Sequence, residues 1–225
     1  MHRPEEEDTD FDETLGTLSD LVRQGKVRYL GTSTFPPSRI VEGQWTAEKR
    51  GRERVVPEQP PYSILTRGVE AEVLPVAQRY GLAVIPWSPL AGGWLTGRYR
   101  TGRPQPESSR AARQPGRFDV DSAESAAKLE AVEALAVLAE QAGITLIELA
   151  LNFVLAHPAV TAPIIGPRTL SQLEEQLGAA DSPLPPDVLD EIDKIVPPGT
   201  TLSARDAGYV PPGLHDTTAR RRIGN

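Results

Sequence analysis

The stretch that decides the fold class of this chain is Leu82–Gly97, LAVIPWSPLAGGWLTG. It opens with Leu82–Ile85, an apolar run of the length and branched composition typical of a buried β-strand. Pro86 cannot donate to a sheet ladder, so we expect the strand to end there. An aromatic, a hydroxyl and a glycine-rich loop follow, and glycine lets a backbone approach a ligand closely. An ordinary strand and loop would give the same pattern, because this stretch is neither a Walker nor a Rossmann motif.

Strand-like segments alternate with helical ones along the chain, and residues 98–121, which lack apolar periodicity, are predicted to form a long mobile loop. The four predicted strands are 27–34, 55–59, 82–86 and 160–165. The predicted helices cover about 10–24, 39–49, 68–80, 123–142, 144–156, 169–177 and a segment from 185 onward. This alternation is typical of a parallel sheet in an α/β fold. Four strands cannot close an eight-stranded barrel, so the chain is either a small open α/β fold or part of a barrel.

Composition excludes several classes of function. The chain has 225 residues, a net charge of −7 and a sequence pI of about 5.1, which argue against binding to nucleic acid or to an anionic membrane. It contains no cysteine, so disulfides and thiolate metal sites are ruled out, and we expect a cytoplasmic location. It has no apolar run long enough to cross a membrane, and its acidic, polar start is unlike a secretory signal.

Five ordered motifs resemble the aldo-keto reductase family. They are WSPLAGGWLTG at 87–97, HRP at 2–4, GKVRYLGTS at 25–33, EQPPYS at 58–63 and PIIGPRT at 163–169. Members of that family are (β/α)₈ TIM barrels that transfer a hydride from NADPH to a carbonyl carbon. The resemblance implies an incomplete barrel in which the four strands are the fifth to the eighth. It assigns residues 1–200 to the reductase domain and 201–225 to an irregular C-terminal tail.

The resemblance implies residues that would hold the nicotinamide end of the cofactor and the substrate. His2 matches the active-site histidine that orients the carbonyl, although a histidine this close to the start of the chain could equally be disordered. Ser33 and Gln59 match the contacts to the carboxamide, and Gln59 can both donate and accept hydrogen bonds. Trp87 matches the aromatic that stacks on the nicotinamide, against the alternative of a core tryptophan.

The resemblance also implies contacts to the rest of NADPH. The loop over the pyrophosphate is matched by Ser88, Pro89, Leu90, Gly92, Leu95 and Gly97. Gly166 to Thr169 precede a helix N-terminus, whose free N–H groups attract anions. Arg168 matches the basic residue at the adenosine 2′-phosphate, so NADPH is favoured over NADH, and a guanidinium suits that dianion. Gln172 and Gln176 match polar contacts to the adenosine. No metal ligands are implied.

One departure from the family pattern bears on activity. The family's general-acid tyrosine, with the lysine and aspartate that tune it, belongs to the first part of the barrel, and no residue of this chain matches them. We therefore expect a chain that lacks the first strands, is inactive alone, and comes from a reductase of aldehydes and ketones. The alternative is a non-catalytic NADPH-binding or interaction module of the same fold. An open sheet edge could pair with another copy, giving a homo-oligomer.

Overall fold

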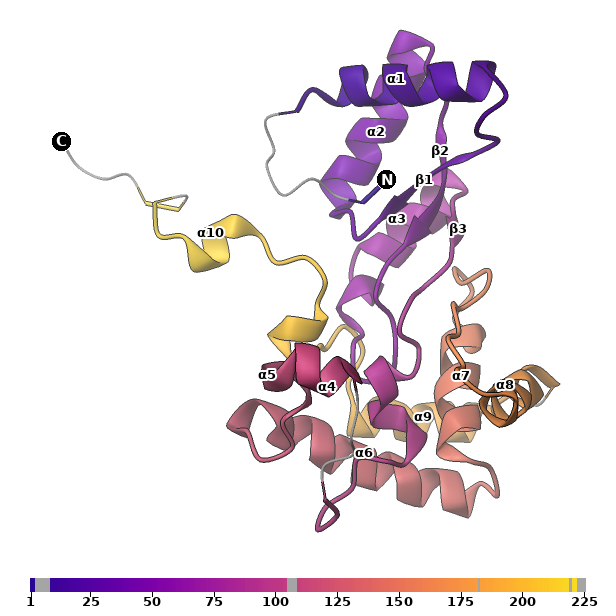
Figure 1. The fold of residues 1–225 in the computed structure, drawn as a ribbon, viewed down its shortest axis with the longest axis vertical. Helices are drawn as coiled ribbons and strands as arrows, with labels where there is room; N and C mark the ends of the chain where they lie inside the picture. Colours follow the sequence, from indigo (N-terminus) through magenta and orange to yellow (C-terminus); the bar gives the residue numbers. More distant parts are fainter. Residues whose placement is uncertain (3–8, 105–108, 182, 219, 222–225) are drawn as a thin grey trace.

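The computed structural model describes residues 1–2, 9–104, 109–181, 183–218 and 220–221, and its centre is a parallel sheet (Figure 1). Its strands are β1 (Leu30–Ser33), β2 (Val55–Gln59) and β3 (Ala83–Val84), in the spatial order β1-β2-β3. Thr32 pairs with Glu58, and Glu58 pairs with Val84. Each strand therefore lies beside the next one in sequence, with helices as crossovers, as predicted for an α/β fold.

Single bridges extend the sheet on both sides. His2 forms a parallel bridge with Ser33, and Val160 forms a parallel bridge with Val84. The predicted strand 160–165 is thus reduced to one bridge, followed by hydrogen bonds from Thr161 N to Val84 O (2.8 Å) and from Ile164 N to Pro86 O (2.8 Å). Pro163 has no N–H to donate, which explains why no regular ladder forms there.

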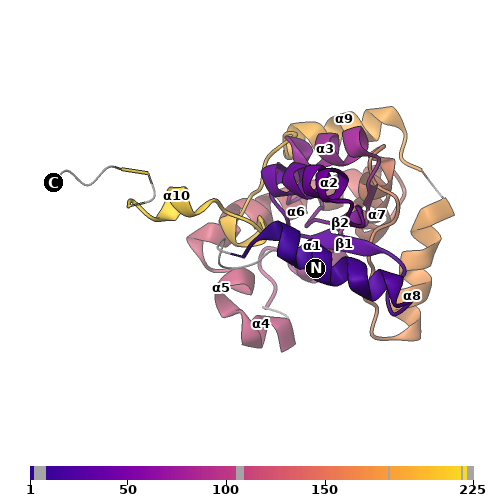
Figure 2. The same cartoon turned by 90° about the horizontal axis from the view of Figure 1, so that it is seen from above.

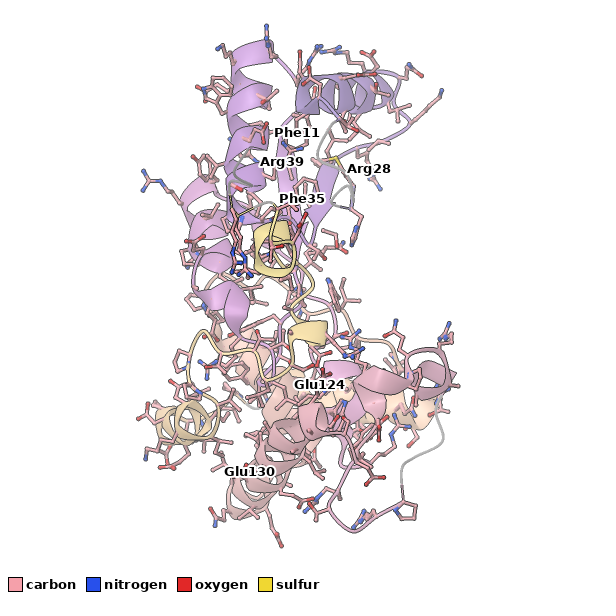
Figure 3. The ribbon with its side chains drawn as sticks, turned by 90° about the vertical axis from the view of Figure 1, so that its left-hand side faces the viewer. Phe11, Arg28, Phe35, Arg39, Glu124 and Glu130 are labelled. Carbon is pink, nitrogen blue, oxygen red and sulfur yellow. The ribbon has the colours of Figure 1, made fainter. Side chains whose placement is uncertain are left out.

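Three helices and a 3₁₀ turn cover the sheet at one end of the molecule (Figure 1). Asp10 caps α1 (Phe11–Arg23) by accepting a hydrogen bond from Asp12 N, and α1 lies against α2 (Pro37–Arg50). The second crossover contains η1 (Gly68–Glu70) and α3 (Val73–Tyr80). Figure 3 shows Phe11, Phe35 and Arg39 together at this end. The two rings stack with centroids 6.0 Å apart, and the Arg39 guanidinium lies 5.2 Å from the centre of the Phe11 ring.

Most of the remaining helices lie at the other end of the molecule (Figure 1), whereas α10 (Pro212–His215) projects away from the rest of the chain, as Figure 2 also shows. The longest, α6, packs against α7, whose start is fixed by a capping box between Thr145 and Glu148. The elements at this end are η2 (Ala91–Thr96), α4 (Ser109–Arg113), α5 (Pro115–Phe118), α6 (Ala123–Gln141), α7 (Leu146–Ala156), α8 (Leu170–Leu177), η3 (Gly178–Asp181), α9 (Pro186–Ile195) and η4 (Ala204–Asp206).

The prediction that residues 98–121 form one featureless mobile loop was wrong for the described part of that segment. It contains the short helices α4 and α5, and Tyr99 and Phe118 are buried, with 2% exposed surface each. Arg100 makes a two-pronged ion pair with Glu133 of α6, with contacts of 2.6 to 2.9 Å. Isolated aromatic anchors of this kind hold the segment through tertiary packing, so they leave no periodic signal in the sequence.

Segment 200–209 packs back against the carboxyl end of the sheet. Arg67 N donates to Thr200 O (2.8 Å), Leu202 N donates to Leu65 O (3.1 Å), and Thr66 forms an antiparallel bridge with Thr201. Arg67 itself, 4% exposed, pairs with Asp193 of α9 at 2.7 Å. This segment therefore closes over the turn that follows β2.

Among the described residues, no single helix is long and apolar enough to cross a membrane. The stretches Pro115–Gln141 and Leu146–Ala156 would together be long and apolar enough to cross a membrane. They meet at a bend of 95°.

Candidate functional site

A cavity of about 750 Å³ opens beside the loop that follows β3. Its walls come from that loop and η2, from the segment that precedes α8, and from α4, α7 and α8. The lining residues are Trp87, Ser88, Pro89, Leu90, Gly92, Gly93, Thr96, Arg98, Arg113, Ile147, Ile164, Ile165, Gly166, Arg168, Gln172, Glu175 and Gln176.

The loop after β3 is held in an unusual backbone conformation. Trp87 N donates to Pro60 O (3.0 Å) and Trp87 O accepts from Tyr62 N (3.3 Å), so Trp87 continues the pairing beyond the end of β3. The next residue, Ser88, has φ +58°, which is uncommon for a non-glycine residue and is found where surrounding contacts enforce it. Two features favour glycine at position 92. Its φ of +69° lies in the left-handed region, and an added Cβ would lie 3.0 Å from the Phe118 ring.

A stack of aromatic rings, which includes Trp94 of η2, packs against this loop. The Trp94 and Tyr99 rings stack with centroids 4.5 Å apart, and Phe118 lies 6.3 Å beyond Tyr99. The Lys128 ammonium lies 4.6 Å from the centre of the Trp94 ring and 3.0 Å from a carboxylate oxygen of Asp206. Burial lowers the pKa of Lys128, and the charge of Asp206 opposes that shift. The stack therefore fixes η2 on α6 and on η4.

Another wall is formed by α8 and the residues just before it. Thr169 caps the helix by accepting from Gln172 N (3.3 Å), and the Gln172 Oε1 atom accepts from Arg168 N (2.8 Å). The Arg168 side chain is exposed at the cavity mouth. Gln176 is 9% exposed, and its Oε1 atom has no hydrogen-bond partner among the described residues. This oxygen is buried and is not open to the cavity, although Gln176 is one of the lining residues.

Positive charge gathers around this cavity. Arg98, Arg113 and Arg168 line it, and among the residues that the structure describes Glu175 is the one carboxylate on its wall. Arg98 Nε also donates to Thr96 Oγ1 (3.2 Å). Three guanidinium groups on a cavity beside a helix N-terminus suit a ligand that carries several phosphate charges.

The predicted residues at the strand ends lie side by side but do not line this cavity. His2 bridges to Ser33, Ser33 pairs with Gln59, and the Ser33 hydroxyl donates to Gln59 O (3.1 Å). His2 is exposed, whereas the other two are half-buried. Pro61, two residues after Gln59, bridges to Trp87, so this rim leads toward the cavity. The residue after Ser33, Thr34, has φ +61°, a rare conformation for a β-branched side chain.

Nine of the fourteen predicted cofactor-binding residues line the cavity; the five that do not are Ser33, Gln59, Leu95, Gly97 and Thr169. Sequence reasoning missed the arginines at 98 and 113 and the glutamate at 175. Arg98 directly follows the motif at 87–97, and this position could have indicated that it lies near the same cavity. Arg113 lies in the segment predicted to be a loop, and nothing in its sequence context marked it. Among the described residues, no three His, Cys, Asp or Glu side chains are grouped to hold a metal ion.

Comparison with known proteins establishes the family. The sequence model of the aldo/keto reductase family matches residues 1–197, so this chain belongs to that family. It is 39% identical over 189 residues to the uncharacterized oxidoreductase YrpG of Bacillus subtilis. The aligned residues are 84% of this chain and 55% of that protein. It is 32% identical over 198 residues to a probable voltage-gated potassium channel subunit beta of Arabidopsis thaliana, covering 87% and 60% respectively.

A third relative is the protein tas of Escherichia coli, which is 33% identical over 183 residues, or 81% of this chain and 52% of that protein. The chain thus spans 52% to 60% of the length of these three relatives. The family assignment agrees with the resemblance of the five motifs and with the parallel sheet of the fold.

Proposed function

We propose that this chain forms the NADPH-binding part of an oxidoreductase that reduces aldehydes and ketones to alcohols, in a fold of the (β/α)₈ barrel type. The observation that carries the proposal is the cavity of about 750 Å³ with three arginines on its walls, beside the N-terminus of α8. A dinucleotide with an additional phosphate offers several anionic groups to these guanidinium groups.

The residues present fit that cofactor. Trp87, Ser33 and Gln59 would hold the nicotinamide at the strand ends, and the loop from Ser88 to Gly97 would cover the pyrophosphate. Arg168 would bind the 2′-phosphate. When bound, NADPH supplies the hydride that reduces the carbonyl carbon.

Two more groups complete the assignment. Gln172 and Gln176 would contact the adenosine. His2, beside Ser33 on the same rim, would orient the substrate carbonyl. With the Gln172 oxygen already accepting from Arg168 N, its amide nitrogen remains the group that can face a ligand.

The test is a fluorescence titration with NADPH and NADH, comparing the native chain with Arg168→Gln. A hydrogen bond to a charged group contributes about 1.5 to 3 kcal/mol, so we expect the variant to bind NADPH at least about tenfold more weakly and NADH equally well. Arg79→Gln, on the exposed end of α3, is the matched control and should change neither affinity. Equal weakening for both cofactors, or no NADPH binding by the native chain, would refute the proposal.

A second candidate function is a non-catalytic NADPH-binding or interaction module. The likeness to a probable potassium channel subunit beta favours it, as does the lack of matches in this chain to the tyrosine, lysine and aspartate of the family pattern. We expect the 225-residue chain to bind NADPH without turnover. Oxidation of NADPH in the presence of an aldehyde, lost on changing Trp87, would instead establish catalysis by this chain.

A further inference from the structure

A second cavity, of about 260 Å³, lies among the turns that follow β1 and β2. The start of α2 and the segment from η1 to α3 form its sides, and Ala207 and Tyr209 of the C-terminal segment contribute to its wall. It shares no lining residue with the larger cavity, so it is a separate site.

The walls of this second cavity are strongly apolar. They include four prolines, Pro36, Pro37, Pro60 and Pro61, together with the ring of Phe35. Proline has no N–H group, so these residues offer carbon surface and no backbone donor to a ligand. Rigid rings on several sides also mean that the cavity cannot close by rotation of flexible side chains.

Several of the hydrogen-bonding groups on the walls are already engaged with the protein. Thr66 N donates to Ser63 O (3.0 Å), and Thr66 O accepts from Ser63 N (3.2 Å). The Thr201 hydroxyl accepts from Gly68 N (3.1 Å). The apolar walls disfavour any charged occupant, because a charge that leaves water without a partner loses its hydration. Glu72 on the wall, in a chain with a net charge of −7, disfavours an anion in particular.

We propose that this cavity is a binding site for a small uncharged molecule built on one aromatic ring or two fused rings. Apolar cavities of about 150 Å³ hold a benzene molecule, so 260 Å³ sets the size of the occupant at one to two rings. Apolar lining with few convergent polar groups is typical of sites that select ligands by shape and hydrophobicity. Thr34 and Pro60 on its wall directly follow Ser33 and Gln59, the residues proposed to hold the nicotinamide. The two cavities share no lining residue, so we expect the occupant and NADPH to bind at the same time.

The probe for the experiment is 5-fluoroindole, observed by ¹⁹F NMR with the full chain. We expect saturable line broadening that persists at saturating NADPH. Ala71→Trp places an indole in the cavity from an exposed position on its wall and should abolish the saturable broadening. Ala127→Trp, on an exposed position of α6 away from both cavities, is the matched control and should bind the probe as the native chain does.

A second blocking variant, Glu72→Trp, covers the case in which Ala71→Trp does not fold, as judged by circular dichroism. We expect this variant, too, to bind the probe at least tenfold more weakly than the native chain does. The proposal is overturned if no saturable binding is found up to the solubility of the probe, if NADPH displaces the probe, or if the folded blocking variants bind it like the control.

Discussion

Gly208 makes a close approach to the turns after β1 and β2 that no other residue type permits. An added Cβ would lie 2.8 Å from Cγ2 of Thr34 and 2.9 Å from Cγ of Pro61. Both neighbours are rigid, since one is a proline ring and the other a β-branched residue in the left-handed region. We therefore expect Gly208→Ala to destabilise the folded chain by two separate effects.

The magnitude follows from comparison with Gly199, which lies in the same C-terminal region. The two glycines have nearly equal φ values, +76° and +75°, but a Cβ on Gly199 would meet nothing within 4 Å. The left-handed conformation costs an alanine about 1 to 2 kcal/mol, and Gly199→Ala should lose that amount. Overpacking adds about 1 to 3 kcal/mol, so Gly208→Ala should lose about 2 to 5 kcal/mol.

The assay is urea unfolding followed by far-ultraviolet circular dichroism, with both variants and the native chain measured together. The difference between the two variants isolates the steric effect, because the backbone cost cancels. If the midpoints and slopes of Gly208→Ala and Gly199→Ala coincide, the close packing of this segment on Thr34 and Pro61 is refuted.

Three further predictions rest on buried polar groups. Burial raises the pKa of Glu58, so the native chain loses stability as the pH rises from the unfolded-state pKa through the folded-state pKa. The Glu58→Gln variant should be as stable as the native chain near pH 4 and increasingly more stable than it toward pH 8. Parallel curves of unfolding free energy against pH for the two proteins would contradict this. Arg67→Ala removes the ion pair to Glu70, which would leave that mostly buried carboxylate uncompensated, together with the pair to Asp193. It should cost about 3 kcal/mol in urea unfolding, whereas a change near zero would contradict this reasoning. Lys128→Met should shift the fluorescence of Trp94, and an unchanged spectrum would contradict the ring contact.

Much of the fold could be predicted because local signals agreed with it. The helices predicted over about 10–24 and 169–177 form as Phe11–Arg23 and Leu170–Leu177, with Asp10 and Thr169 as their caps. Short polar side chains before apolar periodicity favour such ends. The helix predicted at 123–142 forms over Ala123–Gln141. The strand at 160–165 was predicted from apolar composition, which cannot show that its backbone makes one bridge.

The candidate site was harder to predict where tertiary packing decides it. Trp87 and Arg168 come from compact motifs and line the same cavity, as the resemblance implied. Arg113 reaches that cavity from a five-residue helix, which is too short to give a periodic signal. The burial of Lys128 depends on Asp206, which lies 78 residues away, so no local pattern indicates it.

The return of the chain over the turn after β2 has a consequence for the order in which this protein folds. Each strand pairs with its sequence neighbour, so the sheet can assemble from contacts of modest separation. The contact between Gly68 and Thr201, in contrast, joins residues 133 positions apart. The entropy of closing a loop grows with its length, so this contact carries the larger entropic cost. Substitutions in 200–209 should therefore accelerate unfolding while leaving the refolding rate nearly unchanged.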